Sequence, residues 1–155
     1  MNRKLMFSNI NNAWCTPQDF FNKLNAEFNF NLDPCATEKS AKCKKFFTAI
    51  EDGLKQDWGG YRVFVNPPYG RQIGKWVKKC YEESQKPNTL VVILMPSRTD
   101  TRYFHDYILG KAEIRFIKGR LIFWDLDGDK YIRGDFKSMT PAPFPSMIVL
   151  FRLAP

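Results

Sequence analysis

The sequence predicts a single α/β domain of the doubly wound kind, with a mixed sheet. Its 155 residues are the usual size of one domain and are enough to bury a core. An apolar run at Val63-Phe64-Val65 is followed by an amphipathic segment, Gln72 to Gln85, and by a second apolar run, Leu90 to Leu94. Strand, helix and strand in this order indicate a right-handed crossover between parallel strands. A last apolar run, Met147 to Phe151, predicts an antiparallel strand near the C-terminal end.

The first element expected along the chain is a helix that begins at Thr16-Pro17. Threonine is favoured as an N-cap and proline at the first helical position. The apolar residues that follow recur at helical spacing and share one face: Phe20, Phe21, Leu24 and Phe28.

Two short strands are expected next, Phe30 to Asp33 and Phe46 to Thr48. The first ends at Pro34, which has no N–H to donate to a sheet ladder. Its carboxyl end carries Asp33, at the edge where open α/β sheets bind ligands.

One further helix is expected after Leu94, capped by Thr99 or Asp100. Two strands, Glu113 to Ile117 and Leu121 to Trp124, would follow it. The apolar face of the helix would consist of Tyr103, Phe104, Tyr107 and Ile108.

The four residues Asn66-Pro67-Pro68-Tyr69 follow the first central run directly. Because neither proline has an N–H, the backbone must leave the sheet here. The strand end then carries the amide oxygen of Asn66, the carbonyl of Pro67 and the ring of Tyr69. Acceptors beside a stacking surface suit a flat substrate that bears an amino group.

The exocyclic amine of adenine is a substrate of this kind. Its lone pair is delocalised into the ring, so two acceptors that each take one N–H would pull the nitrogen toward tetrahedral geometry and direct the lone pair at an electrophile. Asn66 and Pro67 would be these acceptors, and Tyr69 would stack on the ring.

Composition narrows the possible partners. The net charge of +8 favours a polyanion, with nucleic acid as the first candidate. His105 is the only histidine, which argues against a Ser-His-Asp or Cys-His mechanism. No metal site is expected. The four cysteines lack C-x-x-C spacing, and a calcium loop starting at the acidic stretch 125–129 would have Lys130 instead of glycine at its sixth position and Phe136 instead of glutamate at its twelfth. No apolar run is long enough for a membrane span.

The corner formed by Asn66-Pro67-Pro68-Tyr69 matches the Asp/Asn/Ser-Pro-Pro-Tyr/Phe signature of amino-methyltransferases that use S-adenosylmethionine. Further features follow one another over most of the chain, and in this order they resemble the small phage-borne DNA N6-adenine methyltransferases. These features are Trp14, Thr16-Pro17, the stretch Leu32 to Ala36, Asp52-Gly53-Leu54, Trp58, Asn66 to Tyr69, Trp76, the stretch Pro96 to Thr101, His105, Gly119-Arg120-Leu121 and Phe123.

The resemblance implies a reduced Rossmann-like class I methyltransferase, a three-layer sandwich with a mostly parallel sheet and an antiparallel C-terminal strand. It implies methyl transfer from S-adenosylmethionine to adenine N6 in DNA, with the target base flipped into the Asn66-Pro67-Pro68-Tyr69 corner. The sequence departs from related enzymes where a glycine-rich loop is usual, since Cys35-Ala36 stands there. Trp14, Thr16, Asp33, Cys35, Asn66 and either Asp52 or Asp57 would contact the cofactor, with Asp52 preferred.

The substrate side is expected elsewhere on the chain. Arg98 and Asp100 lie just past a strand end, and Arg133 and Lys137 alternate with aromatic residues in a pattern suited to phosphates and unstacked bases. With Pro68 and Arg120 they form the expected DNA-binding set.

Other readings stay open at this point. Cytosine N4, an adenine in RNA and the side chain of a protein glutamine offer the same amine chemistry, and a non-catalytic DNA-binding protein is possible on the same fold. The expected organisation is one domain over residues 1–155, with residues 1–12 as a flexible leader and no separate target-recognition domain. We expect a monomer or weak dimer in the cytoplasm of the bacterial host, in the setting of phage or restriction-modification DNA methylation.

Overall fold

The computed structural model of the chain describes residues 14–123 and 142–153. Four strands form one mixed sheet: β1 (Arg62–Val65), β2 (Leu90–Pro96), β3 (Glu113–Phe116) and β4 (Ser146–Arg152). Two α-helices, α2 (Gln18–Phe28) and α3 (Ile73–Ser84), accompany the sheet, together with the short helical turns η1 (Gly53–Lys55) and η2 (Phe104–Ile108). The predicted α/β class with a mixed sheet is therefore confirmed.

The strand order in the sheet is β1-β2-β4-β3. β1 pairs with β2 in parallel, with Val65 opposite Ile93, whereas β4 is antiparallel to both of its neighbours. Three strands thus run in one direction, and the C-terminal strand alone is reversed among the described strands. Its side chains from Met147 to Phe151 are all buried, which explains why this strand is a continuous apolar run.

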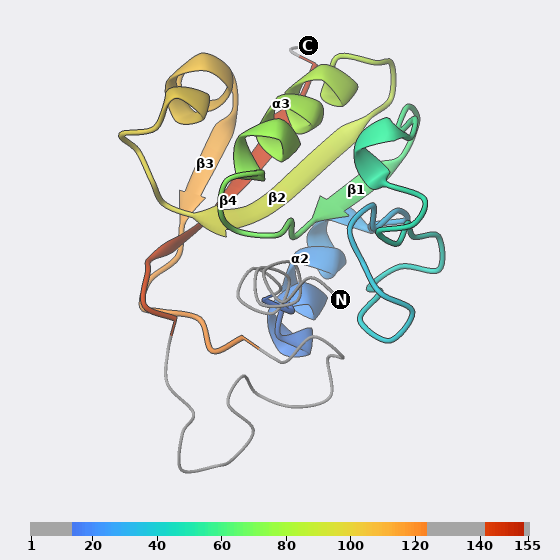
Figure 1. Ribbon diagram of the computed structural model, residues 1–155, viewed down its shortest axis with the longest axis horizontal. Coiled ribbons are helices and arrows are strands. Elements are labelled where there is room, and N and C mark those ends of the chain that lie inside the picture. Colours follow the sequence, from blue (N-terminus) through green and yellow to red (C-terminus); the bar gives the residue numbers. More distant parts are fainter. Residues whose placement is uncertain (1–13, 124–141, 154–155) are drawn as a thin grey trace, which may run out of the picture.

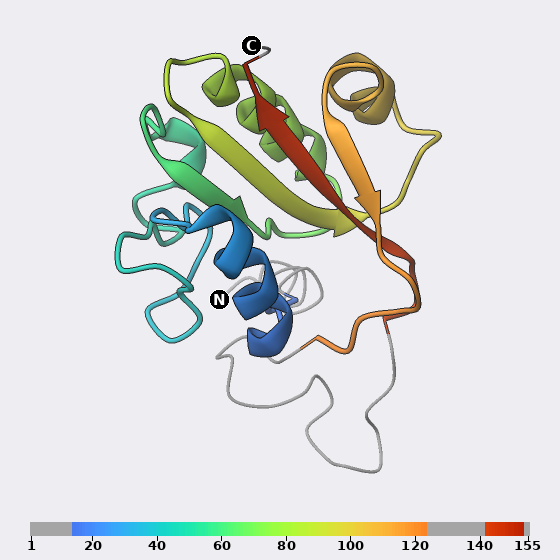
Figure 2. The same cartoon turned by 180° about the vertical axis from the view of Figure 1, so that it is seen from behind.

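The crossover between β1 and β2 is the predicted one. α3 lies in front of β2 and β4 in Figure 1 and behind the sheet in Figure 2. The apolar residues of α3 lie on one face at helical spacing and are all buried: Ile73, Trp76, Val77 and Cys80. Because parallel strands linked in this way end at the same edge, Asn66 after β1 and Ser97 after β2 lie at one edge of the sheet.

α2 lies on the side of the sheet away from α3 (Figure 2). The ring of Phe21 meets the ring of Phe64 edge-on, with 5.1 Å between their centroids, so the helix is anchored on β1. Phe28 is also buried on this face, as the spacing predicts. The predicted N-cap is wrong, because α2 begins after Pro17 without a side-chain cap and Thr16 uses its hydroxyl elsewhere.

Three predicted strands are not strands in the structure. Phe30 to Asp33 and Phe46 to Thr48 form only isolated parallel bridges, from Leu32 to Val63 and from Asp33 to Phe46. Because Pro34 has no N–H to donate, each of these two ladders stops after a single pair of residues, which accounts for the shortness of both segments. In the third segment, Leu121 accepts one backbone hydrogen bond from Ala142, and residues 121–123 adopt no regular structure.

The helix predicted after Leu94 is reduced to the single π-helical turn η2. Its buried residues, Phe104 and Ile108, are two of the four that the sequence assigns to the apolar face. Thr101, and not Thr99 or Asp100, places its hydroxyl where the Phe104 N–H can donate to it, at 3.4 Å.

Candidate functional site

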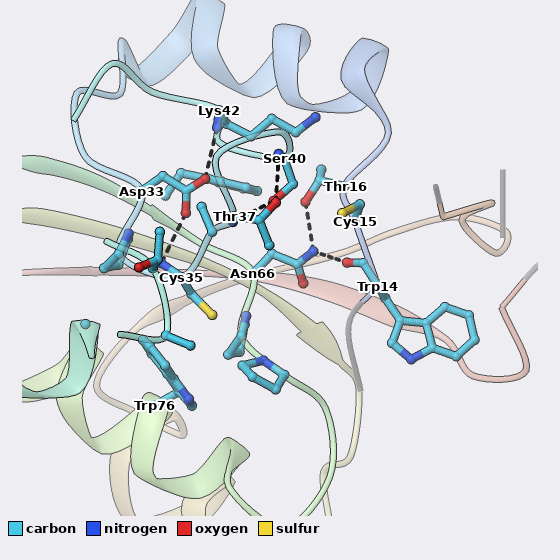
Figure 3. A pocket seen from close by; sticks show the side chains of 18 of the residues that line it. Trp14, Cys15, Thr16, Asp33, Cys35, Thr37, Ser40, Lys42, Asn66 and Trp76 are labelled. Atoms are coloured by element: carbon cyan, nitrogen blue, oxygen red, sulfur yellow. Dashed lines mark hydrogen bonds between the residues drawn. The ribbon is translucent and has the colours of Figure 1, made fainter. Parts of the chain in front are cut away.

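A cavity of about 380 Å³ opens beside the carboxyl end of β1 (Figure 3). It lies where the bridges at Leu32 and Asp33 continue the sheet beyond β1. Pro67 and Pro68 also form part of its wall. The structure brings together in this wall all six residues that the sequence assigns to the cofactor: Trp14, Thr16, Asp33, Cys35, Asp52 and Asn66.

The side chain of Asn66 is held by one end only. Its Nδ2 donates to the backbone carbonyl of Trp14 and to Thr16 Oγ1, the latter at 3.0 Å (Figure 3). Its Oδ1 is buried and has no hydrogen-bond partner among the described residues. A buried acceptor without a donor costs about 1–3 kcal/mol, so the fold keeps this oxygen available at a measurable cost.

Asp33 fixes the loop that forms the opposite wall. Its Oδ1 accepts from the Cys35 N–H at 3.3 Å, and its Oδ2 accepts from the Lys42 N–H at 3.0 Å. Burial raises the pKa of Asp33 to about 7, although both backbone donors favour the charged form. Asp33 therefore lines the cavity and also joins the two ends of the 33–42 loop.

Cys35 presents a thiol to the same cavity. Burial is the main cause that raises its pKa well above the usual range, so the thiol stays neutral at physiological pH. Its contribution to the wall is a small apolar group, without thiolate chemistry.

Asp52 and Asp57, the two acidic residues considered for the cofactor, are in different places. Asp52 lines the cavity, and its Oδ1 accepts from the Leu54 N–H at 3.1 Å at the start of η1. Asp57 is exposed and forms an ion pair with Lys86 at 2.8 Å. The structure thus places Asp52 at the cavity and Asp57 at the surface.

Gly53 permits the approach of η1 to the 33–42 loop. A Cβ atom at this position would lie 1.9 Å from the carbonyl oxygen of Pro34, which no side chain tolerates. The indole N–H of buried Trp58 donates to the Gly53 carbonyl at 3.0 Å, and Trp58 stacks on Trp76 of α3. The indoles of Trp58 and Trp76 therefore support the part of the wall that carries Asp52.

Tyr69 does not line this cavity. Its ring is buried and meets the rings of Phe123 and Phe144 edge-on, at centroid distances of 6.1 and 5.5 Å. Its hydroxyl donates to the carbonyl of Leu94 at 3.2 Å, which ties the corner to β2. Trp14 meets the same two phenylalanines, so a four-ring cluster closes this part of the site.

The predicted DNA-binding residues are scattered. Arg98 lies on a second cavity that Tyr69 also lines, whereas Asp100 is exposed and lines neither cavity. Arg120 is exposed, and its guanidinium donates to the Ala142 carbonyl at 3.4 Å. Arg133 and Lys137, like the predicted leader and the stretch at 125–129, lie outside the described residues.

Sequence reasoning missed the polar loop at 37–42. The hydroxyls of Thr37 and Ser40 are 2.9 Å apart, the Ser40 N–H donates to Thr37 Oγ1, and both residues line the cavity with Lys42. The available signal was position, since this loop follows directly after the strand end at Asp33.

Within residues 14–123 and 142–153, no group of three or more His, Cys, Asp or Glu residues is arranged to hold a metal ion. No helix there is long and apolar enough to cross a bilayer.

The sequence of this chain is similar to one protein family and to curated proteins of two phages. The family model described as DNA N-6-adenine-methyltransferase (Dam) matches residues 6–154. A DNA N-6-adenine-methyltransferase of Escherichia phage T1 is 32% identical over 126 residues, which are 80% of this chain and 52% of that protein. One of Haemophilus phage HP1 is 33% identical over 106 residues, 67% of this chain and 61% of that protein. The chain thus spans between half and two thirds of the length of these curated relatives.

Proposed function

Because the chain belongs to the DNA N-6-adenine-methyltransferase family, we propose that it transfers a methyl group from S-adenosylmethionine to adenine N6 in DNA. One observation carries the proposal at the level of chemistry. The buried Oδ1 of Asn66 is without a partner among the described residues, while Nδ2 of the same amide is fixed by two acceptors.

S-adenosylmethionine would occupy the cavity beside β1, and when bound it supplies an electrophilic methyl group. A volume of about 380 Å³ lies within the range of ligand pockets, roughly 300–1,000 Å³. The walls offer the carboxyl group of Asp52 for hydroxyl groups, the indole of Trp14 for a cation, and hydroxyls at Thr37 and Ser40. Asp33 and Cys35 would shape the floor, and Thr16 would act through Asn66.

Asn66 and the Pro67 carbonyl would each accept one N–H of the adenine amine. Trp14 and Thr16 hold the amide so that its oxygen, and not its nitrogen, is presented to the substrate. An acceptor fixed in advance does not have to reorganise when charge develops on the nitrogen. No strong base is needed, since the nitrogen becomes acidic once it is methylated.

Tyr69 would supply the ring against which the base stacks, and its bond to the Leu94 carbonyl fixes the ring plane. Extruding the base from a duplex costs a few kcal/mol, which contacts with the DNA backbone must offset. Pro68, Arg98, Asp100, Arg120, Arg133 and Lys137 are the proposed DNA-facing residues, and the net charge of +8 supports such contacts.

A reduced Rossmann-like, three-layer class I arrangement is proposed for the fold. It is supported by α3 on one side of the sheet, by α2 anchored through Phe21 on the other, and by the single reversed strand β4. We also propose that the protein is a monomer or weak dimer in the cytoplasm of the bacterial host. There it would act in phage or restriction-modification DNA methylation.

The direct test of the acceptor role is the variant Asn66→Ala. We expect kcat to fall roughly 100-fold or more, as for loss of one preorganised polar contact in other active sites. Cofactor binding, measured by calorimetry, should change little. Asn66→Asp should retain part of the activity, because it keeps an acceptor while losing the two N–H donors.

Asn22→Ala serves as the matched control, since Asn22 is exposed on α2 far along the chain from the corner. It should leave both kcat and cofactor binding as in the unmodified protein. Full activity of Asn66→Ala would refute the acceptor role. Absence of any S-adenosylmethionine binding at millimolar concentration would instead favour a non-catalytic DNA-binding protein.

A further inference from the structure

A second cavity, of about 400 Å³, lies on the other side of the Asn66-Pro67-Pro68-Tyr69 corner. It shares no wall residue with the cavity beside β1. The corner divides between the two: Asn66, Pro67 and Pro68 face the first cavity, whereas Tyr69 and the following Gly70-Arg71 face the second. Any group held in the second cavity is therefore next to the reacting corner but outside the cofactor space.

The wall of the second cavity is positively charged. Arg71 comes from the loop before α3, and Arg98 comes from the loop after β2. Both are exposed, and neither forms an ion pair with a carboxylate in the described part of the chain. No acidic residue belongs to the wall, so an anion would meet two guanidinium groups without a competing carboxylate.

The rest of the wall is built by close packing. The ring of Tyr103 rests on the backbone of Gly74, where a Cβ atom would lie 3.4 Å from Tyr103 Cδ1. Burial raises the pKa of Tyr103, so its hydroxyl stays protonated and is a donor at neutral pH. The ring of Phe144 closes the cavity toward Tyr69.

We propose that this second cavity binds a backbone phosphate of the DNA strand that carries the target adenine, through the guanidinium groups of Arg71 and Arg98. The inference rests on the proposed function and adds to it a substrate subsite and a residue, Arg71. A planar guanidinium matches the oxygens of a phosphodiester, and a phosphate fixed beside Tyr69 would hold the extruded nucleotide in register with Asn66.

The test compares Arg71→Gln, Arg98→Gln and the double variant with Arg102→Gln. Arg102 is exposed on the same segment but does not belong to the cavity wall, which makes it a matched control. Binding of a fluorescein-labelled random-sequence DNA duplex would be followed by anisotropy as a function of salt concentration. S-adenosylmethionine binding would be measured in parallel by calorimetry, and thermal melting would confirm that each variant is folded.

The double variant loses the one phosphate contact, so it should reduce the slope of log K against log[salt] by about 1 and weaken binding to all sequences alike. Each single variant should reduce the slope by less, because the other guanidinium still faces the phosphate. Cofactor affinity should be unchanged in all of them, and the KM for DNA should be raised more than kcat is lowered. Arg102→Gln should keep the slope of the unmodified protein.

Three results would overturn the inference. If the unmodified protein methylates DNA and the double variant keeps the same salt slope, the phosphate subsite is refuted while the proposed function stands. Weaker cofactor binding in the double variant would assign the arginines to the cofactor. If the unmodified protein binds no DNA, both the inference and the proposed function fail.

Discussion

Asn66 is an amide whose two ends have different environments. The nitrogen is held by Trp14 and Thr16, which precede α2, so residues separated by about fifty positions fix one rotamer. The oxygen has no hydrogen-bond partner among the described residues, which is the basis for the proposed acceptor role. An aspartate at this position would have no N–H for these acceptors, which gives asparagine a structural role as well as a chemical one.

Asp33 should make the free energy of unfolding depend on pH. Its pKa rises from 3.8 in the unfolded reference to about 7 in the folded protein, so the folded state holds a proton that the unfolded state releases between these values. Stability from this group is therefore greatest at low pH and falls as pH rises toward 7, by at most about 1.4 kcal/mol per pH unit.

Urea denaturation of the unmodified protein and of Asp33→Asn at several pH values would measure this effect. The difference between their free energies of unfolding should change steadily between about pH 4 and pH 7 and be constant above. A difference that is the same at every pH would show that Asp33 titrates normally in the folded protein.

Among the elements, the turn η1 depends on one glycine. A Cβ at Gly53 would overlap the Pro34 carbonyl, so Gly53→Ala must displace either η1 or the 33–42 loop. We expect a loss of roughly 1–3 kcal/mol in the free energy of unfolding, the usual cost of overpacking, together with weaker cofactor binding.

Gly74→Ala is the control for this prediction, because its Cβ would meet Tyr103 at an ordinary contact distance of 3.4 Å. Alanine is favoured over glycine in a helix by about 1 kcal/mol, so this variant should be at least as stable as the parent. Thermal melting and calorimetry of both variants would decide the matter. Equal stability of Gly53→Ala and the parent would contradict the close approach.

The elements also show what local sequence signals determine. The crossover from β1 through α3 to β2 is predictable, because apolar periodicity and proline-ended runs act over a few residues. The Thr16 N-cap is not predictable, since the hydroxyl of Thr16 accepts from Asn66, which lies fifty positions along the chain. The early strands are short because Pro34, next to Asp33, stops the ladder, and this local signal was available in the sequence.

For the whole molecule, the predicted cofactor residues meet in one cavity although they are spread from Trp14 to Asn66. The order of features along the chain was informative because the fold brings strand ends to one edge. The predicted parallel pairing of β1 with β2 brings Arg71 and Arg98 to one edge of the sheet, but no sequence signal indicates that they line a common cavity. Charge alone indicated a polyanion without locating its contacts.

The most direct measurement is a transfer assay with tritiated S-adenosylmethionine offered DNA, RNA and protein in parallel, followed by nucleoside and amino-acid analysis. The account predicts label in DNA as N6-methyladenine and its loss in Asn66→Ala. Label in N4-methylcytosine, in RNA or in a protein glutamine, or no label from a chain that binds the cofactor, would contradict it.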